Sequence, residues 1–129
     1  MPVTPILTNH YGAAVETLED YREVMDRVDD ARCRTVLEVG HFHSAGIGWR
    51  EAYDALWPSF ALVHIKDQVG AQSEAFGQGE VDLPGLFARL IADRWEGDAV
   101  VEMENEDTEN TAQYLRAAVS YIKAHTEVS

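Results

Sequence analysis

The stretch "SFALVHIKDQ" (Ser59–Gln68) begins as an apolar strand and ends in groups that are costly to bury. Because side chains alternate along a strand, Val63 and Ile65 share one face, and His64 and Lys66 share the other. The aliphatic face can pack under helices, which leaves the polar face on the opposite side of the sheet. The pattern predicts a strand with a polar site at its carboxyl end.

Three further aliphatic runs resemble this one: "PILTN" (5–9), "RTVLEVG" (34–40) and "DAVVEME" (98–104). Segments with helical periodicity follow the four runs. The first expected helix follows the N-cap Thr17 and has Leu18, Tyr21, Met25 and Val28 on one stripe, and the second lies around 49–57 and ends before Pro58. The third follows Asp82 and has Leu83, Leu86, Phe87, Leu90 and Ile91 on one stripe. The fourth covers 108–125 and has Leu115, Ala118, Val119 and Ile122 on one face. This alternation favours a single α/β domain over 1–129, made of four βα units on a parallel sheet.

The composition is acidic, and this limits the expected partners. The 129 residues carry a formal net charge of −13, whereas binding to nucleic acid or an anionic membrane requires a basic face. We therefore expect a small-molecule ligand, no nucleic acid and no membrane. Cys33 is the only cysteine, so no disulfide forms within the chain and a reducing compartment is the simpler interpretation. The N-terminal residues show neither a charged leader nor a long apolar run, which is typical of a cytoplasmic protein.

Polar side chains gather at the carboxyl ends of all four expected strands, where parallel α/β proteins place their chemistry. They are Thr8, Asn9 and His10 after the first run, Glu38, His41 and His43 after the second, His64, Lys66 and Asp67 after the third, and Glu102, Glu104 and Asn105 after the fourth. Two or three carboxylates with one or two imidazoles are ligands typical of Mn²⁺, Mg²⁺, Zn²⁺ or Co²⁺. We predict a divalent-metal site formed by Glu38, His64 and Glu102.

These side chains also have a structural interpretation. A single histidine at a strand end is more often a hydrogen-bonded structural residue than a ligand, and residues 104–106 can be a solvated acidic loop. We assign no function to His43 or Glu106. Glycines in "AGIG" and "GQGEVDLP" allow sharp turns near the strand ends, but neither loop matches a phosphate-binding fingerprint.

With these segments in order, the sequence resembles the xylose-isomerase-like TIM-barrel superfamily, which includes sugar phosphate isomerases, epimerases and endonuclease-IV-like enzymes. "LTNHYG" is similar to the family's Glu-Asn-His-Gly strand end, and "LEVGHFHSAG" to its Asp-x-Gly-His segment with a following Ala-Gly. "VHIKD" resembles its His-x-Lys-Asp motif, "GQGEVDL" its Gly-x-Gly-x-x-Asp loop, and "VVEME" its last Glu-bearing strand. The resemblance covers essentially the whole chain but only the second half of such a barrel, strands five to eight.

The resemblance implies a divalent metal that polarises a sugar carbonyl and hydroxyl while two glutamates shuttle a proton between neighbouring carbons. It assigns Glu38, His64 and Glu102 to the metal, and Glu102 also to acid–base catalysis. We predict Glu102 and Glu38 as the catalytic residues. The resemblance assigns substrate contacts to His41 and, at matching motif positions, to Asn9, His10 and Lys66.

Two residues depart from the family pattern. Thr8 stands where many relatives have the other glutamate, so a hydroxyl group replaces a metal ligand and proton carrier of the two-base mechanism. Glu38 is one methylene longer than the expected aspartate, so its reach to a metal differs.

Four βα units cover only the outer face of a barrel sheet, and both terminal strands would show unpaired backbone. We therefore predict a homodimer that completes an eight-stranded barrel or a closely related sandwich. A separately encoded first half is a second possibility, and a helix or swapped segment over the open face is a third.

For function, the sequence favours a metal-dependent isomerase, epimerase or related lyase that acts on a small polyol or keto-sugar. The alternative is a catalytically silent half-barrel, a binding or assembly module that keeps the motifs without the chemistry. DNA-repair endonuclease activity has a precedent in the family but conflicts with the acidic composition.

Overall fold

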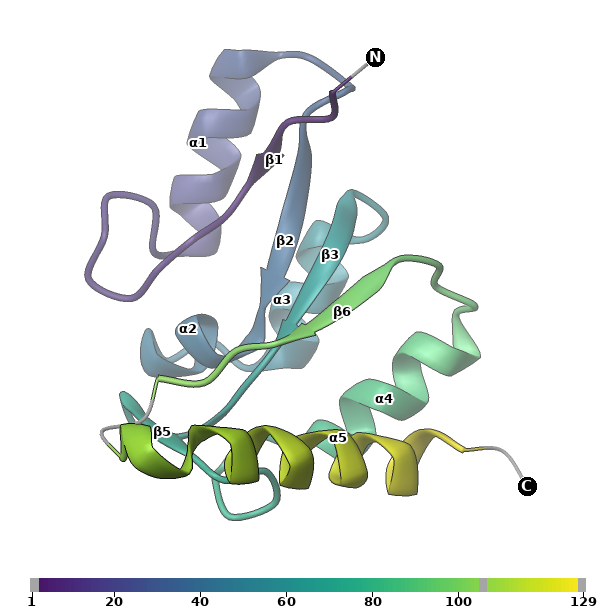
Figure 1. The fold of residues 1–129 in the computed structure, drawn as a ribbon. Helices are drawn as coiled ribbons and strands as arrows, with labels where there is room; N and C mark the ends of the chain where they lie inside the picture. The colour runs from purple at the N-terminus through teal and green to yellow at the C-terminus, as the bar shows by residue number, and fades with distance from the viewer. Residues whose placement is uncertain (1–2, 105–106, 128–129) are drawn as a thin grey trace.

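The computed structural model describes residues 3–104 and 107–127 and contains a parallel sheet with the strand order β1-β2-β3-β6 (Figure 1). The strands are β1 (Ile6–Leu7), β2 (Arg34–Glu38), β3 (Phe60–Ile65) and β6 (Asp98–Val101). All neighbouring pairs are parallel. The predicted four parallel βα units are confirmed. Asn105 and Glu106 lie outside the described residues.

Each expected helix forms after its strand: α1 (Leu18–Val28), α3 (Trp49–Leu56), α4 (Leu83–Ala92) and α5 (Thr111–Thr126). Local sequence explains their starts. Thr17 and Asp20 form a capping box on α1, in which each side chain accepts a hydrogen bond from the other's backbone N–H. Asp82 accepts from Gly85 N–H at the start of α4.

Several short elements were not expected. The predicted strand 34–40 ends two residues too late, because the chain turns into the short helix α2 (Val39–Ser44) directly after Glu38. An antiparallel hairpin of β4 (Asp67–Val69) and β5 (Gln72–Glu74) follows β3, and a 3₁₀ turn, η1 (Thr108–Asn110), precedes α5. Strand β6 ends at Val101, earlier than predicted, although Glu102 N–H still donates to the Ile65 carbonyl at 3.0 Å.

The hydrophobic core lies between the helices and one face of the sheet. Its strand residues include Leu37, Val63 and Ile65, so Glu38 and His64 point to the opposite face. The helices contribute most of the rest: Leu18 and Tyr21 from α1, Val39 and Phe42 from α2, Trp49, Ala52, Tyr53 and Leu56 from α3, and Leu83, Leu86, Phe87 and Leu90 from α4. None of the helices in the described part of the chain is long and apolar enough to cross a membrane.

Three apolar side chains predicted on buried stripes are instead exposed. Ile91 is 48% exposed, Leu115 40% and Val119 45%. Helix α5 contacts the core through Tyr121, Ile122 and the buried Ala118, and it packs beside α4. The stripe on α5 is therefore rotated relative to the prediction, and its outer part faces away from the core.

Candidate metal and substrate site

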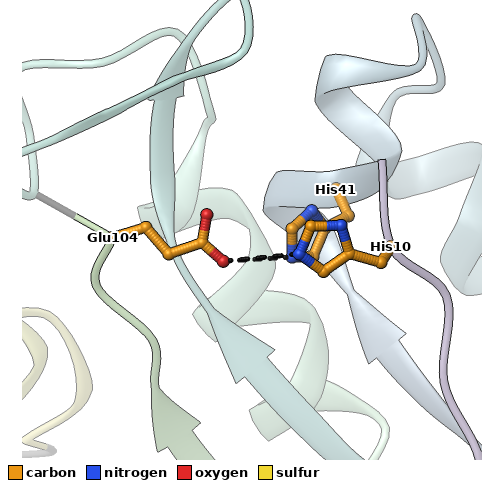
Figure 2. A group of neighbouring side chains, drawn as sticks. All are labelled: His10, His41 and Glu104. Atoms are coloured by element: carbon orange, nitrogen blue, oxygen red, sulfur yellow. Dashed lines mark ion pairs between the residues drawn. The ribbon is translucent and has the colours of Figure 1, made fainter. Parts of the chain in front are cut away.

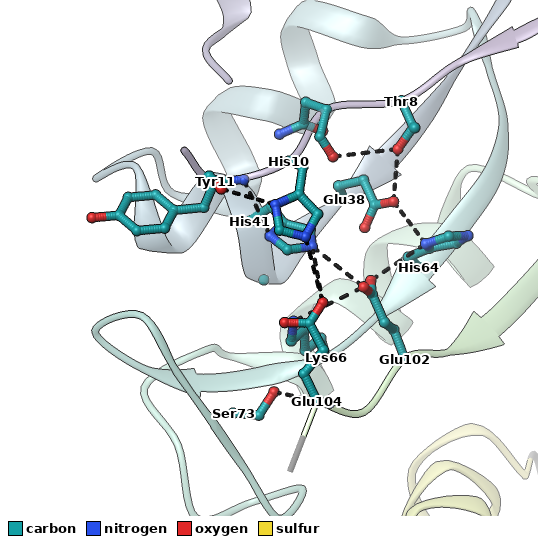
Figure 3. A network of polar contacts seen from close by, with 12 residues as sticks. Thr8, His10, Tyr11, Glu38, His41, His64, Lys66, Ser73, Glu102 and Glu104 are labelled. Atoms are coloured by element: carbon teal, nitrogen blue, oxygen red, sulfur yellow. Dashed lines mark hydrogen bonds and ion pairs between the residues drawn. The ribbon is translucent and has the colours of Figure 1, made fainter. Parts of the chain in front are cut away.

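Strand ends from all four βα units bring Thr8, Glu38, His64 and Glu102 together (Figure 3). Thr8 Oγ1 donates to Glu38 Oε1 at 2.8 Å, and the same oxygen lies 2.7 Å from His64 Nδ1. Glu102 Oε2 lies 3.4 Å from His64 Nδ1 on the other side. The structure thus brings together all three residues predicted to hold a metal.

Two atoms of this group are left without hydrogen bonds. His64 Nδ1 and Glu102 Oε2 are buried and make no hydrogen bond among the described residues, although Glu38 Oε1 lies only 2.7 Å from His64 Nδ1. A divalent cation between them would satisfy both atoms, because it binds imidazole nitrogen and carboxylate oxygen at about 2.0–2.2 Å. One imidazole with two carboxylates suits Zn²⁺, Mn²⁺ or Co²⁺. The residues present therefore fit the implied metal.

The pKa values of the two carboxyl groups, Glu38 and Glu102, are shifted in opposite directions. Burial raises the pKa of Glu38 to about 8, and the neighbouring charge of Glu102 adds to this effect. The hydrogen bond from His41 lowers the pKa of Glu102 well below its ordinary value, and the Lys66 ammonium group acts in the same direction. Without a cation, the protonated form is therefore favoured at Glu38 and the ionised form at Glu102.

His41 lies on α2, and its side chain is only 4% exposed. Tyr11 N–H donates to His41 Nδ1 at 3.3 Å, so the neutral ring carries its proton on Nε2. That nitrogen lies 3.3 Å from Glu102 Oε1. His41 is thus positioned as a fixed hydrogen-bond donor beside the predicted base. Glu38, His41 and Glu102 also place one ligand atom each within 4.8 Å of one another.

The rings of His10 and His41 are in contact, with centroids 3.9 Å apart and planes tilted by 35°, and both rings face Glu104 (Figure 2). His10 Nδ1 lies 2.8 Å from the Tyr11 carbonyl, which can only accept, so this nitrogen carries a proton. His10 Nε2 lies 3.6 Å from Glu104 Oε1, and His41 Nε2 lies 3.8 Å from the same oxygen. The Tyr11 peptide units therefore fix the two imidazoles in opposite tautomers.

Lys66 is a buried cation at the floor of the site. Its side chain is 3% exposed, and Nζ lies 3.2 Å from Glu104 Oε2 and 4.0 Å from Glu102 Oε1. Its stem packs against Gly40, where an added Cβ would lie 2.7 Å from Lys66 Cδ. The ammonium group is thereby placed between two carboxylates and can hold a hydroxyl or carbonyl oxygen of a ligand.

Asn9 and Asp67, two of the polar residues at the strand ends, are engaged by the fold. Asn9 is 2% exposed, donates to the Glu16 carbonyl and accepts from the Tyr21 hydroxyl, so the substrate contact expected for it stays a prediction. Asp67 accepts from the N–H groups of Gly77, Gly79 and Val81 and orders the glycine-rich loop. His43, assigned no function, places its Nε2 3.4 Å from Glu80 Oε1.

Sequence reasoning missed two contributors. Tyr11 acts through its backbone, which no side-chain pattern reveals. Ser73 accepts a 3.4 Å hydrogen bond from Glu104 N–H and lies on the hairpin that was not expected. A pocket of about 240 Å³, lined by residues that include Ser73, Glu102 and Tyr114, opens beside the site.

The fold and the site together define half of a TIM barrel with an imidazole and carboxylate cluster at the carboxyl ends of its strands. The chain belongs to the xylose isomerase-like TIM-barrel family, whose sequence profile matches residues 2–125. The expected family is thereby confirmed.

The chain is similar to inosose dehydratases in sequence and to sugar epimerases in structure. The chain is 26% identical over 140 residues to inosose dehydratase of Clostridium perfringens, an alignment that covers 93% of this chain and 47% of the relative. The structure of 3-keto-D-glucoside 4-epimerase from E. coli matches with a TM-score of 0.73 and 22% identity over 92% of this chain and 45% of that one. An IolI protein with a bound zinc atom matches with a TM-score of 0.72 and 20% identity over 94% and 47% of the two chains. At these identities the structures establish the fold alone.

The chain spans about half the length of the curated relatives it matches. This share agrees with the four βα units of the sheet, since a complete barrel of this type has eight. The predicted half-barrel is therefore confirmed as a fold.

Proposed function

We propose that this chain forms the metal-binding wall of an enzyme that moves a proton next to a carbonyl group of a small polyol or keto-sugar. The observation that carries the proposal is the convergence of three ligand atoms: Glu38 Oε1 and Glu102 Oε2 lie 2.7 Å and 3.4 Å from His64 Nδ1. His64 Nδ1 and Glu102 Oε2 are buried and make no hydrogen bond within the described part of the chain. The names of relatives, an inosose dehydratase and a keto-glucoside epimerase, support the same class of substrate.

A divalent cation, when bound, supplies positive charge that polarises a substrate oxygen. Glu102 stays ionised and accepts the proton from carbon, and the electron pair moves onto the carbonyl oxygen. His41 Nε2–H and the Lys66 ammonium group lie beside Glu102 and orient the substrate oxygens.

The acid–base inventory favours a reaction with one base. Glu38 belongs to the metal group, and Thr8 offers a hydroxyl that is too weak an acid to replace a carboxyl group. A single carboxylate can carry a proton between neighbouring carbons on one face, or return it to a departing hydroxyl group. Epimerisation needs a second group on the opposite face. We therefore propose that the enzyme is an isomerase or dehydratase rather than an epimerase.

Metal binding by the 129-residue chain tests the proposal. Titration with Co²⁺, followed by its visible absorption, should show stoichiometric binding that His64→Ala weakens by more than about tenfold. His43→Ala is the matched control, because this histidine lies near the site and contacts Glu80 instead. Wild-type protein that binds neither Co²⁺ nor Zn²⁺ would contradict the proposal.

A catalytically silent half-barrel is the second candidate, and the hydroxyl group of Thr8 in place of the family's glutamate favours it. The two functions differ in turnover. Metal-loaded chain incubated with an inosose in D₂O should exchange the proton next to the carbonyl, as followed by NMR, and Glu102→Gln should abolish the exchange. Stoichiometric metal without exchange would identify a silent module.

A further inference from the structure

The sheet face that carries the site has an aliphatic layer below the polar one. Two residues back along each strand from Thr8, Glu38, His64 and Glu102, and therefore on the same face, lie Ile6, Val36, Leu62 and Val100. The central members are well covered, since Val36 is 3% exposed and Leu62 is partly buried. The edge members Ile6 and Val100 are each 42% exposed. The aliphatic layer is thus exposed to solvent at both edges of the sheet.

The backbone of the same two edge strands has one side without a strand partner in the described part of the chain. Strand β1 pairs only with β2, and β6 only with β3, so each leaves one edge without a strand partner within residues 3–104 and 107–127. Figure 1 shows these strands on opposite sides of the sheet. Most exposed large apolar side chains also belong to the first or last βα unit, among them Val28 of α1 and Leu115 and Val119 of α5. Unpaired edges with apolar surface favour association with another sheet.

We propose that a second copy of this chain covers the site face, with β6 of each copy paired in parallel to β1 of the other. One half presents one β1 edge and one β6 edge, so a two-fold rotation matches each edge to its complement. Both pairings form at once and close a ring of eight strands without a free edge. A second copy satisfies this condition without any further component.

Closure would also complete the site. The metal-binding residues of one copy line one side of the barrel opening at the carboxyl ends of the strands. A second copy would place another set of Glu38, His64 and Glu102 on the opposite side. The aliphatic residues Ile6 and Val100 would fill the interior below. The proposal rests on the fold and not on the proposed function, since strand edges and apolar area require no metal or catalysis.

Sedimentation equilibrium of the 129-residue chain, in EDTA and ~0.15 M salt over ~1–100 µM protein, tests the proposal. We expect twice the chain mass of 14.4 kDa. Val100→Lys and Ile6→Lys should each raise the dissociation constant at least ~100-fold, because each places two uncompensated charges in the ring. Ile91→Lys is the matched control, because Ile91 is 48% exposed and lies on helix α4, not on the site face of an edge strand, so the mass should be unchanged.

A wild-type chain that sediments at 14.4 kDa throughout and melts cooperatively would overturn the proposal. Open assemblies that grow with concentration, or a dimer that Ile91→Lys disrupts as strongly as Val100→Lys, would overturn it as well. Circular dichroism of each variant must show an intact fold, which exposed positions should permit. Because EDTA is present, a failure of the metal proposal cannot produce any of these results.

Discussion

Thr8 Oγ1 donates a 2.8 Å hydrogen bond to Glu38 Oε1, the oxygen that also lies 2.7 Å from His64 Nδ1. This bond favours the ionised form of Glu38 and opposes the effect of burial on its pKa. Thr8→Val keeps the shape but removes the donor. We expect the pKa of Glu38 to rise further and Co²⁺ affinity at pH 7 to fall about three- to tenfold, as for loss of about 1 kcal/mol.

Thr8→Ser is the control for this prediction, because it keeps the hydroxyl group and loses only a methyl group. Its Co²⁺ affinity should stay within about twofold of the wild type. Equal losses in the Val and Ser variants would show that packing of the methyl group, and not the hydrogen bond, sets the affinity.

Gly40 and Lys66 meet so closely that only a glycine fits. A Cβ at position 40 would lie 2.7 Å from Lys66 Cδ and 2.9 Å from Lys66 Cβ and Cγ. The Lys66 Cβ cannot move aside by side-chain rotation, because it is bonded to the backbone directly after β3. We expect Gly40→Ala to destabilise the fold by about 1–3 kcal/mol, because overpacking forces the backbone to shift. Urea unfolding measures the effect. Gly48→Ala is the control, because its Cβ would meet nothing within 4 Å, and a loss as large as that of Gly40→Ala would contradict this explanation.

Much of the fold and site could be predicted because the deciding signals are local. Alternation in 59–68 assigns both the core face and the site face of β3, and it correctly places His64 beside Glu38 and Glu102. The capping box at Thr17 and Asp20 fixes the start of α1 in the same way. Such patterns depend on residues a few positions apart, so the sequence itself contains them.

The rest depends on tertiary contacts. Val39 and Gly40 read as the end of a strand, but the chain turns into α2 there and packs Gly40 closely against Lys66 of the neighbouring strand end. The role of Tyr11 lies in its backbone, and the exposure of Leu115 depends on how α5 docks beside α4. Each of these needs coordinates of a residue distant in sequence, which periodicity does not supply.

Tyr21 ties α1 to two strands through its hydroxyl group. The side chain is fully buried, and the hydroxyl lies within hydrogen-bond distance of the Val36 carbonyl at 3.1 Å and of the Leu7 carbonyl and Asn9 Oδ1 at 3.2 Å each. We expect Tyr21→Phe to cost about 1–2 kcal/mol of unfolding free energy, because buried acceptors lose their donor.

Tyr114→Phe provides the comparison, since that hydroxyl group donates to Asp107 at an exposed position. Its loss should change the unfolding free energy by no more than about 0.5 kcal/mol. Urea unfolding of both variants checks the pair. Similar losses would mean that burial does not amplify the Tyr21 hydrogen bonds.

Glu38 should make the stability of the metal-free protein depend on pH. Its folded pKa of about 8 lies above the ordinary value of 4.5, so the folded state binds the proton more tightly than the unfolded chain does. This contribution to stability is complete below about pH 4.5 and is lost as the pH rises toward about 8. Glu38→Gln lacks the titrating group. In EDTA, the stability of the wild type relative to this variant should therefore fall between about pH 5 and pH 8 and then level off, as measured by urea unfolding. Parallel curves for the two proteins would refute the assignment. Excess Zn²⁺ should remove the decline in the wild type, because the cation takes the place of the proton.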